Sequence, residues 1–316
     1  MVGKPGKKPS SPSKRSSIAT LVGTLGETLG LTELTVRDDG QLWGSGSGVS
    51  QLRDGVFSSI EIPRVLMPVT VSRREEITIS GIETIEAEGA DWDAPPAAMR
   101  YWVGDVVEEV TPIPRFGVAW VALDSTGRAG AYCASEDLEL VRIQIVRPGG
   151  PRAAIELATS SNRVAAAFDA AGRLVVADGQ ALVRYDATGR PVARLDAKLS
   201  PEVQRLRLEV LEDDRVLVVE DPGKVRVFET GKAEFSWDER TQKRGAAIPS
   251  HICAGVTGQF LVIASNCGLT VASIPDAAVV GNVKRLGKSP TAMALLPGGR
   301  LAVTGWDEIY QLALPA

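Results

Sequence analysis

The chain has 316 residues, of which 44% are apolar and only 5% aromatic, and it carries a formal net charge of −4. This length suffices for one large domain with a core built mainly from Val, Leu, Ile and Ala. No apolar run reaches the roughly 18 residues of a membrane span, so we expect no membrane contact. Three cysteines without metal-ligand spacing indicate small buried hydrophobes of a reducing compartment, and hence a cytoplasmic protein.

Residues 1–17 contain five basic residues, no acidic residue, and otherwise mostly Pro, Ser and Gly. Such a composition buries too little apolar surface to order itself, so we expect a disordered basic tail before a single domain at 18–316. An alternative is that the tail binds nucleic acid or an acidic partner. The remaining chain is acidic, with a net charge of −9, so nucleic acid is expected only through the tail. The basic residues are Lys4, Lys7, Lys8, Lys14 and Arg15.

The segment that begins at Leu31, LTELTVRDDGQLWGSGSGVSQLRDG, predicts short strands joined by a turn at Asp39-Gly40. Trp43-Gly44 follows that turn. This order resembles the regulator of chromosome condensation repeat, in which an apolar strand, a DG turn and a Trp-Gly strand follow one another. Residues 80–89, SGIETIEAEG, resemble the strand that leads into the Gly-rich turn of the same repeat. The resemblance implies a seven-bladed β-propeller used for protein contacts.

Residues 163–195 predict four short strands separated by tight turns. Asp169 and Asp186 open two of these turns, and each is followed three residues later by a glycine. Asp bonds to backbone two residues further on, and Gly accepts positive φ, so both favour hairpins. Pro191 suits the start of an outer strand, because nothing there needs its missing N–H. The run DAAGRLVVADGQALVRYDATGR resembles NHL and gluconolactonase-like propeller repeats.

The strand that follows each turn recurs at a period in the low forties, which predicts seven blades in one all-β ring. No DG turn marks the second blade, where spacing places the equivalent position near Ile85. The other positions, each the apolar residue that opens the second strand, are Leu42, Ala129, Leu174, Val216, Phe260 and Leu301.

The last blade is one strand short at the end of the chain, because only 309–314 remain after its second strand. We expect residues 18–23 to supply the missing outer strand and so to close the ring. Closure removes the exposed edges that make open sheets prone to aggregate.

Partner-binding residues are expected in two places, because function concentrates in loops on a rigid scaffold. One is the long charged loop at 238–250, which ends beside the single histidine. The other is a predicted hairpin tip in the last blade, where a tryptophan stands next to an acid, a residue pair typical of interface anchors. The candidate residues are Asp238, Glu239, Arg240, Lys243, Arg244, His251, Trp306 and Asp307.

No catalytic, metal-binding or cofactor motif is predicted. A Ser-His-Asp or Cys-His arrangement would depend on His251 alone, and no nucleophile elbow G-x-S-x-G is present. Cys253 and Cys267 lie fourteen residues apart without a second pair, which does not fit zinc. Lactonase-type propellers hold a divalent ion through Glu, Asn and Asp, and four such residues near strand ends leave this alternative open: Asn162, Asp178, Asp221 and Asn266.

The sequence therefore favours a non-enzymatic protein-binding platform, a bacterial-type seven-bladed propeller that acts as a scaffold or recruitment subunit. Chains of this class are paired in several bacterial systems with AAA-type ATPases and von Willebrand A-like proteins, which we expect as partners. The first alternative is a metal-dependent propeller hydrolase, lactonase or lyase. The second is a nucleic-acid-associated protein that uses its basic tail.

Overall fold

The structure of the chain is a computed structural model. The description covers residues 18–26, 28, 30–46, 48–62, 66, 68–74, 76–85, 88–89, 96–110, 118–135, 140–150, 152–160, 163–178, 180–199, 205–221, 224–228, 235–238, 252–275, 278–284 and 288–315. Among these residues no helix is long and apolar enough to cross a membrane.

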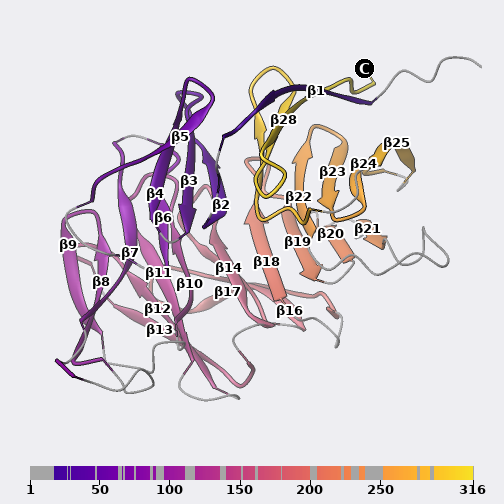
Figure 1. The fold of residues 1–316 in the computed structure, drawn as a ribbon. Helices are drawn as coiled ribbons and strands as arrows, with labels where there is room; N and C mark the ends of the chain where they lie inside the picture. Colours follow the sequence, from indigo (N-terminus) through magenta and orange to yellow (C-terminus); the bar gives the residue numbers. More distant parts are fainter. Residues whose placement is uncertain are drawn as a thin grey trace, which may run out of the picture.

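Seven four-stranded antiparallel sheets surround a central axis, and each sheet is one blade of a β-propeller (Figure 1). The first four blades follow one another along the chain. Blade 1 is β2 (Leu31–Val36), β3 (Leu42–Gly46), β4 (Val49–Arg53) and β5 (Val56–Ser59); blade 2 is β6 (Val69–Val71), β7 (Ile79–Ile85), β8 (Ala98–Val103) and β9 (Val106–Val110); blade 3 is β10 (Val118–Leu123), β11 (Gly130–Ser135), β12 (Val141–Val146) and β13 (Ala153–Leu157); blade 4 is β14 (Ala165–Phe168), β15 (Leu174–Ala177), β16 (Ala181–Tyr185) and β17 (Pro191–Asp196).

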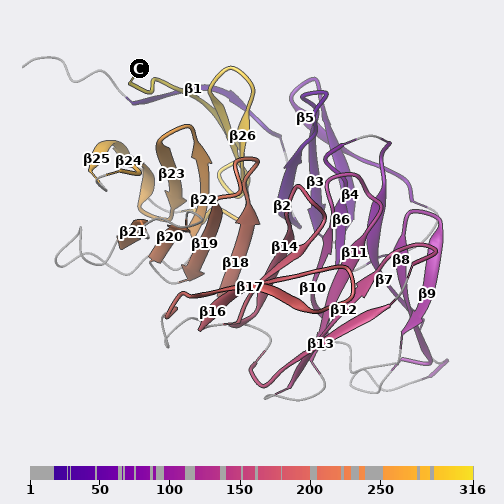
Figure 2. The same cartoon turned by 180° about the vertical axis from the view of Figure 1, so that it is seen from behind.

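The remaining three blades complete the circle, and the last of them takes its outer strand from the start of the chain (Figure 2). Blade 5 is β18 (Arg205–Val210), β19 (Val216–Asp221), β20 (Lys224–Phe228) and β21 (Phe235–Asp238); blade 6 is β22 (Ile252–Thr257), β23 (Phe260–Ser265), β24 (Gly268–Ser273) and β25 (Val279–Lys284); blade 7 is β26 (Met293–Leu296), β27 (Arg300–Val303), β28 (Glu308–Leu312) and β1 (Ala19–Thr24). The predicted seven-bladed all-β ring is confirmed.

The inner turn of blade 4 shows how local chemistry makes each hairpin. The carboxylate of Asp169 accepts the backbone N–H of Ala171 at 3.0 Å and that of Arg173 at 2.9 Å. Gly172 takes a φ of 71°, which a residue with a side chain adopts only with strain. The strands on either side coincide with the predicted ones, because aspartate and glycine fix the turn and the β-branched runs on both sides pack as strands.

Blade 2 departs from the predicted spacing. Its second strand begins at Ile79 and ends at Ile85. Ile85, near which the spacing predicted the start of this strand, is therefore its last residue. The turn before this strand is built without aspartate, because the hydroxyl of Ser72 accepts the Thr78 N–H at 3.0 Å and donates to the Glu76 carbonyl at 3.0 Å. Because a serine forms this turn, the sequence shows no Asp-Gly pair there. The second strand also starts earlier than the fixed repeat length predicts, so the blades differ in length.

The ring closes where β1 pairs with β28 in antiparallel register, with Ala19 opposite Leu312 and Thr24 opposite Glu308. This confirms the prediction that the beginning of the chain completes the last blade. Ile18, just before β1, packs directly on Gly281 of β25, so the closing strand also lies against blade 6. A bulge between Leu21 and Gly23 interrupts the pairing.

Apolar clusters fill the spaces between neighbouring blades and hold the ring together. The largest of them joins β11, β12 and β13 of blade 3 to β15 and β16 of blade 4. A second cluster joins blades 6 and 7 and includes the closing residues Ile18 and Ala19. Burial of such surface stabilises a fold by about 25 cal/mol per Å².

Buried and half-buried arginines add directional bonds between blades. Arg37 of blade 1 donates to the Ser72 carbonyl of blade 2 at 2.7 Å, and Arg147 of blade 3 donates to the Gly172 carbonyl of blade 4 at 2.6 Å. In blade 5, Arg226 pairs with Glu220 at 2.7 Å, with side chains 6% and 1% exposed. Arg226 also donates to the carbonyl of Lys198, which follows blade 4, at 3.1 Å.

Replacing Gly281 with alanine tests the packing of the closing strand. The new Cβ would lie 2.7 Å from the Cβ of Ile18, so β1 has to shift. We expect the free energy of unfolding in urea to fall by about 1–3 kcal/mol, the usual cost of overpacking. The control is Gly48→Ala, where no atom lies within 4 Å and stability should be unchanged or slightly higher. Equal effects of the two substitutions would contradict the role of this contact.

Replacing Arg226 with methionine tests the buried ion pair. The carboxylate of Glu220, which is 1% exposed, then loses its ion pair with Arg226, so we expect a loss of about 3–5 kcal/mol in the free energy of unfolding. The double variant Arg226→Met/Glu220→Leu removes both charges and should recover most of that loss. A double variant as unstable as the single one would show that the stranded carboxylate is not the cause.

Candidate functional site

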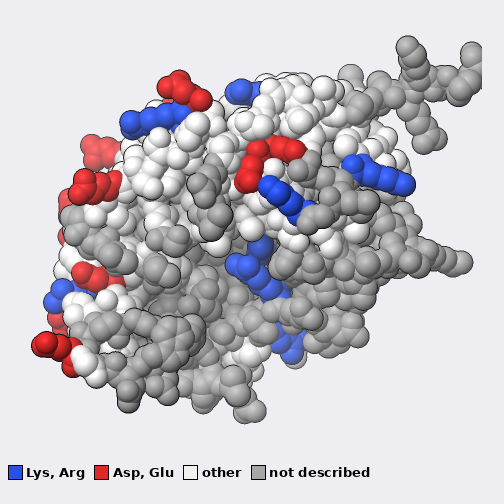
Figure 3. All heavy atoms as spheres, viewed as in Figure 1, with Lys and Arg blue, Asp and Glu red and all other residues white. Residues whose placement is uncertain are grey.

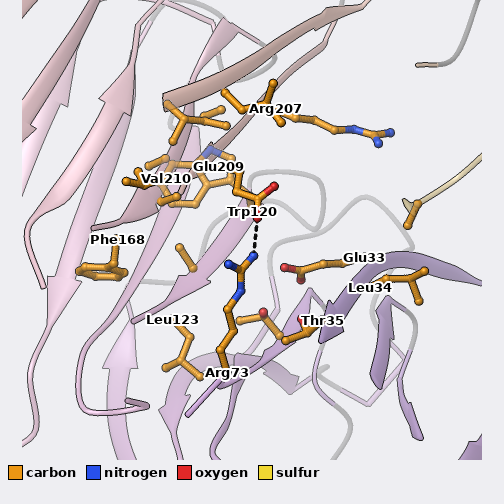
Figure 4. A pocket seen from close by; sticks show the side chains of 18 of the residues that line it. Glu33, Leu34, Thr35, Arg73, Trp120, Leu123, Phe168, Arg207, Glu209 and Val210 are labelled. Carbon is orange, nitrogen blue, oxygen red and sulfur yellow. Dashed lines mark hydrogen bonds and ion pairs between the residues drawn. The ribbon is translucent and has the colours of Figure 1, made fainter. Parts of the chain in front are cut away.

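The candidate site is a cavity of about 780 Å³ on the propeller axis. Residues of all seven inner strands or their flanking turns line it, so every blade contributes to its wall (Figure 4). The volume lies in the range of about 300–1,000 Å³ that is typical of pockets for small ligands.

An ion pair crosses this cavity between opposite blades. Arg73 follows the inner strand of blade 2, Glu209 lies on the inner strand of blade 5, and their Nη2 and Oε1 atoms are 2.8 Å apart (Figure 4). The two residues are 136 positions apart in the sequence. Glu209 raises the pKa of the Arg73 guanidinium, so this cation keeps its charge at any ordinary pH.

A second arginine lies at the mouth of the cavity, where the inner hairpins turn. Its Nε is 3.4 Å from Asp38 of blade 1, and its Nη2 is 3.7 Å from Glu212 of blade 5; this residue is Arg74. The two carboxylates are 61% and 86% exposed, so water screens both pairs and each contributes little to stability.

Glu33 is the carboxylate of the cavity that lacks an ion pair within 4 Å among the described residues. It accepts a hydrogen bond from the Ser45 hydroxyl at 3.2 Å and another from Thr70. Although water in the cavity reaches it, desolvation by the surrounding protein raises its pKa above the ordinary 4.5. The two hydroxyl bonds and the positive charge of Arg73 offset only part of this effect.

Arg207 is the matching cation on the inner strand of blade 5. Its Nη1 donates to the Sγ of Cys253 at 3.2 Å and to the carbonyl of Thr291 at 3.4 Å. Both partners are neutral groups, so within the described part of the chain no carboxylate balances this guanidinium.

Trp120 contributes an indole to the cavity from the inner strand of blade 3. Its ring nitrogen donates to the carbonyl of Val164 on blade 4 at 3.0 Å, which fixes the orientation of the ring. Phe168 of blade 4 is a second aromatic residue in the wall (Figure 4). The cavity therefore combines fixed charges with an aromatic surface.

The cysteines form no disulfide among the described residues. All three are free thiols, and Cys133 is fully buried. Burial raises the pKa of the Cys133 thiol to about 12, so it stays protonated and unreactive at neutral pH.

The described residues contain no group of three or more His, Cys, Asp or Glu side chains placed to hold a metal ion. Of the residues considered for a channel metal, Asp178 accepts the backbone N–H groups of Gln180 and Ala181, and Asn266 lies beside Cys267. Both act within their own turns. Asn162 and the side chain of Asp221 lie outside the described residues.

Trp306 lies in the predicted hairpin between the second and third strands of blade 7, but it does not project from the tip. It is 2% exposed, and its indole donates to the Lys288 carbonyl at 2.9 Å. It packs edge-on against Tyr310, with ring centroids 6.2 Å apart. The expectation of a surface anchor is wrong for this indole, because ring closure places it in the core between blades 6 and 7.

Asp307, the neighbouring candidate, holds the connection between β1 and β2. Its carboxylate accepts a hydrogen bond from Thr28, and its backbone carbonyl accepts the Leu25 N–H at 3.0 Å. It takes a φ of 61° and forms an ion pair with Lys288 at 3.5 Å. Asp307 therefore helps to hold the start of the chain against the last blade, and one third of its side chain is exposed.

The other predicted residues are not tested by the described structure. Asp238 ends β21, and nothing is described of its side chain. The rest of the loop with its histidine, and the basic tail, lie outside the described residues: Glu239, Arg240, Lys243, Arg244 and His251, and Lys4, Lys7, Lys8, Lys14 and Arg15. The charged cavity residues were missed by the sequence reading. The sequence signal that could have found Glu33, Arg207 and Glu209 is a charged residue inside an inner strand that is otherwise mostly apolar.

The fold and cavity define the chain as a seven-bladed β-propeller with a charged axial channel. No family model matches the chain, and no curated protein matches it. Solved propellers are similar in fold. The β-propeller domain of Myceliophteria thermophila Cps50 (Swd1) has a TM-score of 0.64 at 13% identity, covering 93% of this chain and 100% of that one.

Two similar structures are lyases. A catalytically inactive histidine-to-alanine variant of virginiamycin B lyase from Staphylococcus aureus, with quinupristin, gives a TM-score of 0.64 at 16% identity and covers 94% of this chain and 100% of that one. A streptogramin B lyase gives 0.62 at 14% identity, covering 94% and 98%. At these identities the likeness establishes the fold and not the activity.

Replacing Glu33 with glutamine tests the electrostatics of the channel. Because folding raises the pKa of Glu33 above 4.5, its ionised form destabilises the folded state at neutral pH. We expect Glu33→Gln to raise the melting temperature at neutral pH. The gain should shrink as the pH falls through the raised pKa and vanish below 4.5, where the wild-type carboxyl is protonated in both states.

Thermal denaturation followed over this pH range is the measurement. The matched control is Glu212→Gln, which changes the same charge at the exposed channel mouth and should alter the melting temperature little. The groups that face Glu33 are Arg73, Glu209, Thr70 and Ser45. A lower melting temperature of Glu33→Gln at neutral pH would show that attraction to Arg73 outweighs desolvation.

Proposed function

We propose that this propeller is a non-enzymatic platform that binds a protein partner on its outer rim beside the closure. The observation that carries the proposal is an exposed apolar patch on the outer strands of three neighbouring blades. We call it the rim patch: Leu21 and Val22 on β1, Val56 on β5, and Val279 and Val280 on β25.

Contacts along the closure connect the members of the rim patch. Gly281, next to Val280, packs against Ile18 at the start of β1. At the other end of β1, Gly26 packs against Val56. Figures 1 and 2 both show β1 running between β25 and β5, so the strands that carry the rim patch are neighbours along this part of the rim.

The closing strand β1 exposes apolar side chains, as the outer strand β17 of blade 4 also does. Leu21 and Val22 are 52% and 54% exposed, and Val22 lies in the bulge, out of register with β28. The surface over the middle of β1 is mostly free of charged side chains in Figure 3. Contiguous exposed apolar residues rimmed by polar ones are typical of interaction surfaces, and bulges commonly re-aim side chains at such sites.

The partner class that we propose, from the resemblance of the sequence, is an AAA-type ATPase or a von Willebrand A-like protein. We also propose, from the same sequence resemblance, that the N-terminal repeats belong with the regulator of chromosome condensation repeats and the later ones with the NHL repeats. The alternatives, a metal-dependent hydrolase or lyase and a nucleic-acid-associated protein, have no observation in their favour among the described residues.

Replacing Val22 with aspartate tests the rim patch. A charge placed in an apolar interface is left desolvated, so we expect partner binding to weaken by roughly tenfold or more. The matched control is Val192→Asp on β17 of blade 4, where the replaced valine is 52% exposed and lies on a distant part of the rim. Both variants should melt like the wild type, because both side chains are exposed.

The measurement is affinity capture from a lysate of the source cells with each purified protein, followed by titration of the captured protein. A partner that binds wild type and Val192→Asp alike, and Val22→Asp weakly, supports the proposal. Equal binding to both variants would locate the interface elsewhere. Metal-dependent turnover of a lactone by the purified chain would replace the platform with the enzyme alternative.

A further inference from the structure

We propose that the axial channel binds a small zwitterion with one ammonium and one carboxylate group, of the size of an amino acid or a dipeptide. This site lies inside the ring and is independent of the rim patch. It uses Glu33 for the ammonium, Arg207 for the carboxylate and Trp120 for the apolar part of the ligand.

The three residues occupy one level of the channel. Each inner hairpin begins with a residue whose N–H donates across the turn: Arg37 to Gln41, Asp124 to Ala129, and Leu211 to Arg215, at 2.8–2.9 Å. Glu33, Trp120 and Arg207 each precede that residue by four positions. At about 3.3 Å per residue, all three lie about 13 Å below the hairpins. They come from blades 1, 3 and 5, on separate sectors of the wall.

Backbone irregularities mark two of the three positions. The pairing of β2 shifts register between Leu31 and Glu33, and the pairing of β10 shifts between Val118 and Trp120. These bulges stand at equivalent places in two different blades, immediately before the two residues. A bulge re-aims the side chain that follows it and is frequent beside binding sites.

The remaining charges of the channel already have partners, which leaves Glu33 and Arg207 as the open pair. Arg73 pairs with Glu209, and Arg74 lies between Asp38 and Glu212. Within the described ranges, Glu33 receives hydroxyl donors alone, and Arg207 donates to a thiol sulfur and a carbonyl and to no carboxylate. Both side chains appear on the cavity wall in Figure 4.

A zwitterion satisfies both groups at once. Its ammonium would form an ion pair with the Glu33 carboxylate, and its carboxylate would match the planar guanidinium of Arg207. A ligand with a single charge leaves one of the two groups desolvated without a partner, which costs affinity. The indole of Trp120, held by Val164, offers a fixed apolar surface to the rest of the ligand.

The test is isothermal titration of the full chain with a matched set of ligands. L-Leucine carries both charges, isoamylamine lacks the carboxylate, and isocaproate lacks the ammonium. Glycyl-leucine separates the two charges further and distinguishes a peptide from a free amino acid, and the other standard amino acids complete the panel. We expect saturable binding of one zwitterion at least, with each single-charge analogue weaker by about tenfold or more.

Variants assign the two charges. Glu33→Gln should remove the advantage of the zwitterion over the carboxylate-only analogue, and Arg207→Gln its advantage over the amine-only analogue. Arg207→Lys keeps the charge and covers the case in which Arg207→Gln fails to fold, as judged by circular dichroism. The matched control Glu212→Gln, at the channel mouth, should bind like the wild type.

Three results would overturn the proposal. One is that no amino acid or dipeptide of the panel binds saturably at millimolar concentration. Another is that the single-charge analogues bind as tightly as the zwitterion. The third is that folded Glu33→Gln and Arg207 variants discriminate among the ligands as the wild type does. Loss of the rim-patch partner affects none of these readouts, so the two proposals fail separately.

Discussion

The pairing of β1 with β28 is the constraint on which the rest of the structure depends. It joins the two ends of the chain, and the bond from Thr28 to Asp307 spans 279 positions of sequence. The entropic cost of closing a loop grows only slowly with its length, so one added strand is enough to close a ring of this size. Closure gives every blade a neighbour on both sides, and the apolar faces of blades 6 and 7 meet around Ile18 and Trp306.

Closure also turns seven separate sheets into the wall of one channel. The apolar clusters between blades hold neighbouring blades together. They do little to fix the angle between those blades, because the hydrophobic effect has no direction. The arginine bonds to carbonyls of the next blade, such as Arg37 to Ser72 and Arg147 to Gly172, are directional. They hold blade 1 to blade 2 and blade 3 to blade 4, which are the blades whose inner strands carry Glu33 and Trp120.

The two surfaces that we propose for binding differ in chemistry. The rim patch is apolar and exposed, and it includes the outer strand of blade 7, which comes from the start of the chain and is bulged at Val22. The channel holds paired charges, the carboxylate of Glu33 with its hydroxyl donors, and an aromatic wall. A large partner matches the first surface and a small ligand the second.

The sequence by itself determined the repeat, the hairpins with their aspartates and glycines, the seven blades and the closing strand, because each depends on turn chemistry and alternation within about forty residues. It misplaced the second strand of blade 2, where Ser72 replaces aspartate. Only the tertiary structure decided that Trp306 is buried and that Arg73 meets Glu209 across the channel. These contacts join residues far apart in the sequence, and no local pattern records which inner-strand side chains face one another once the ring is closed.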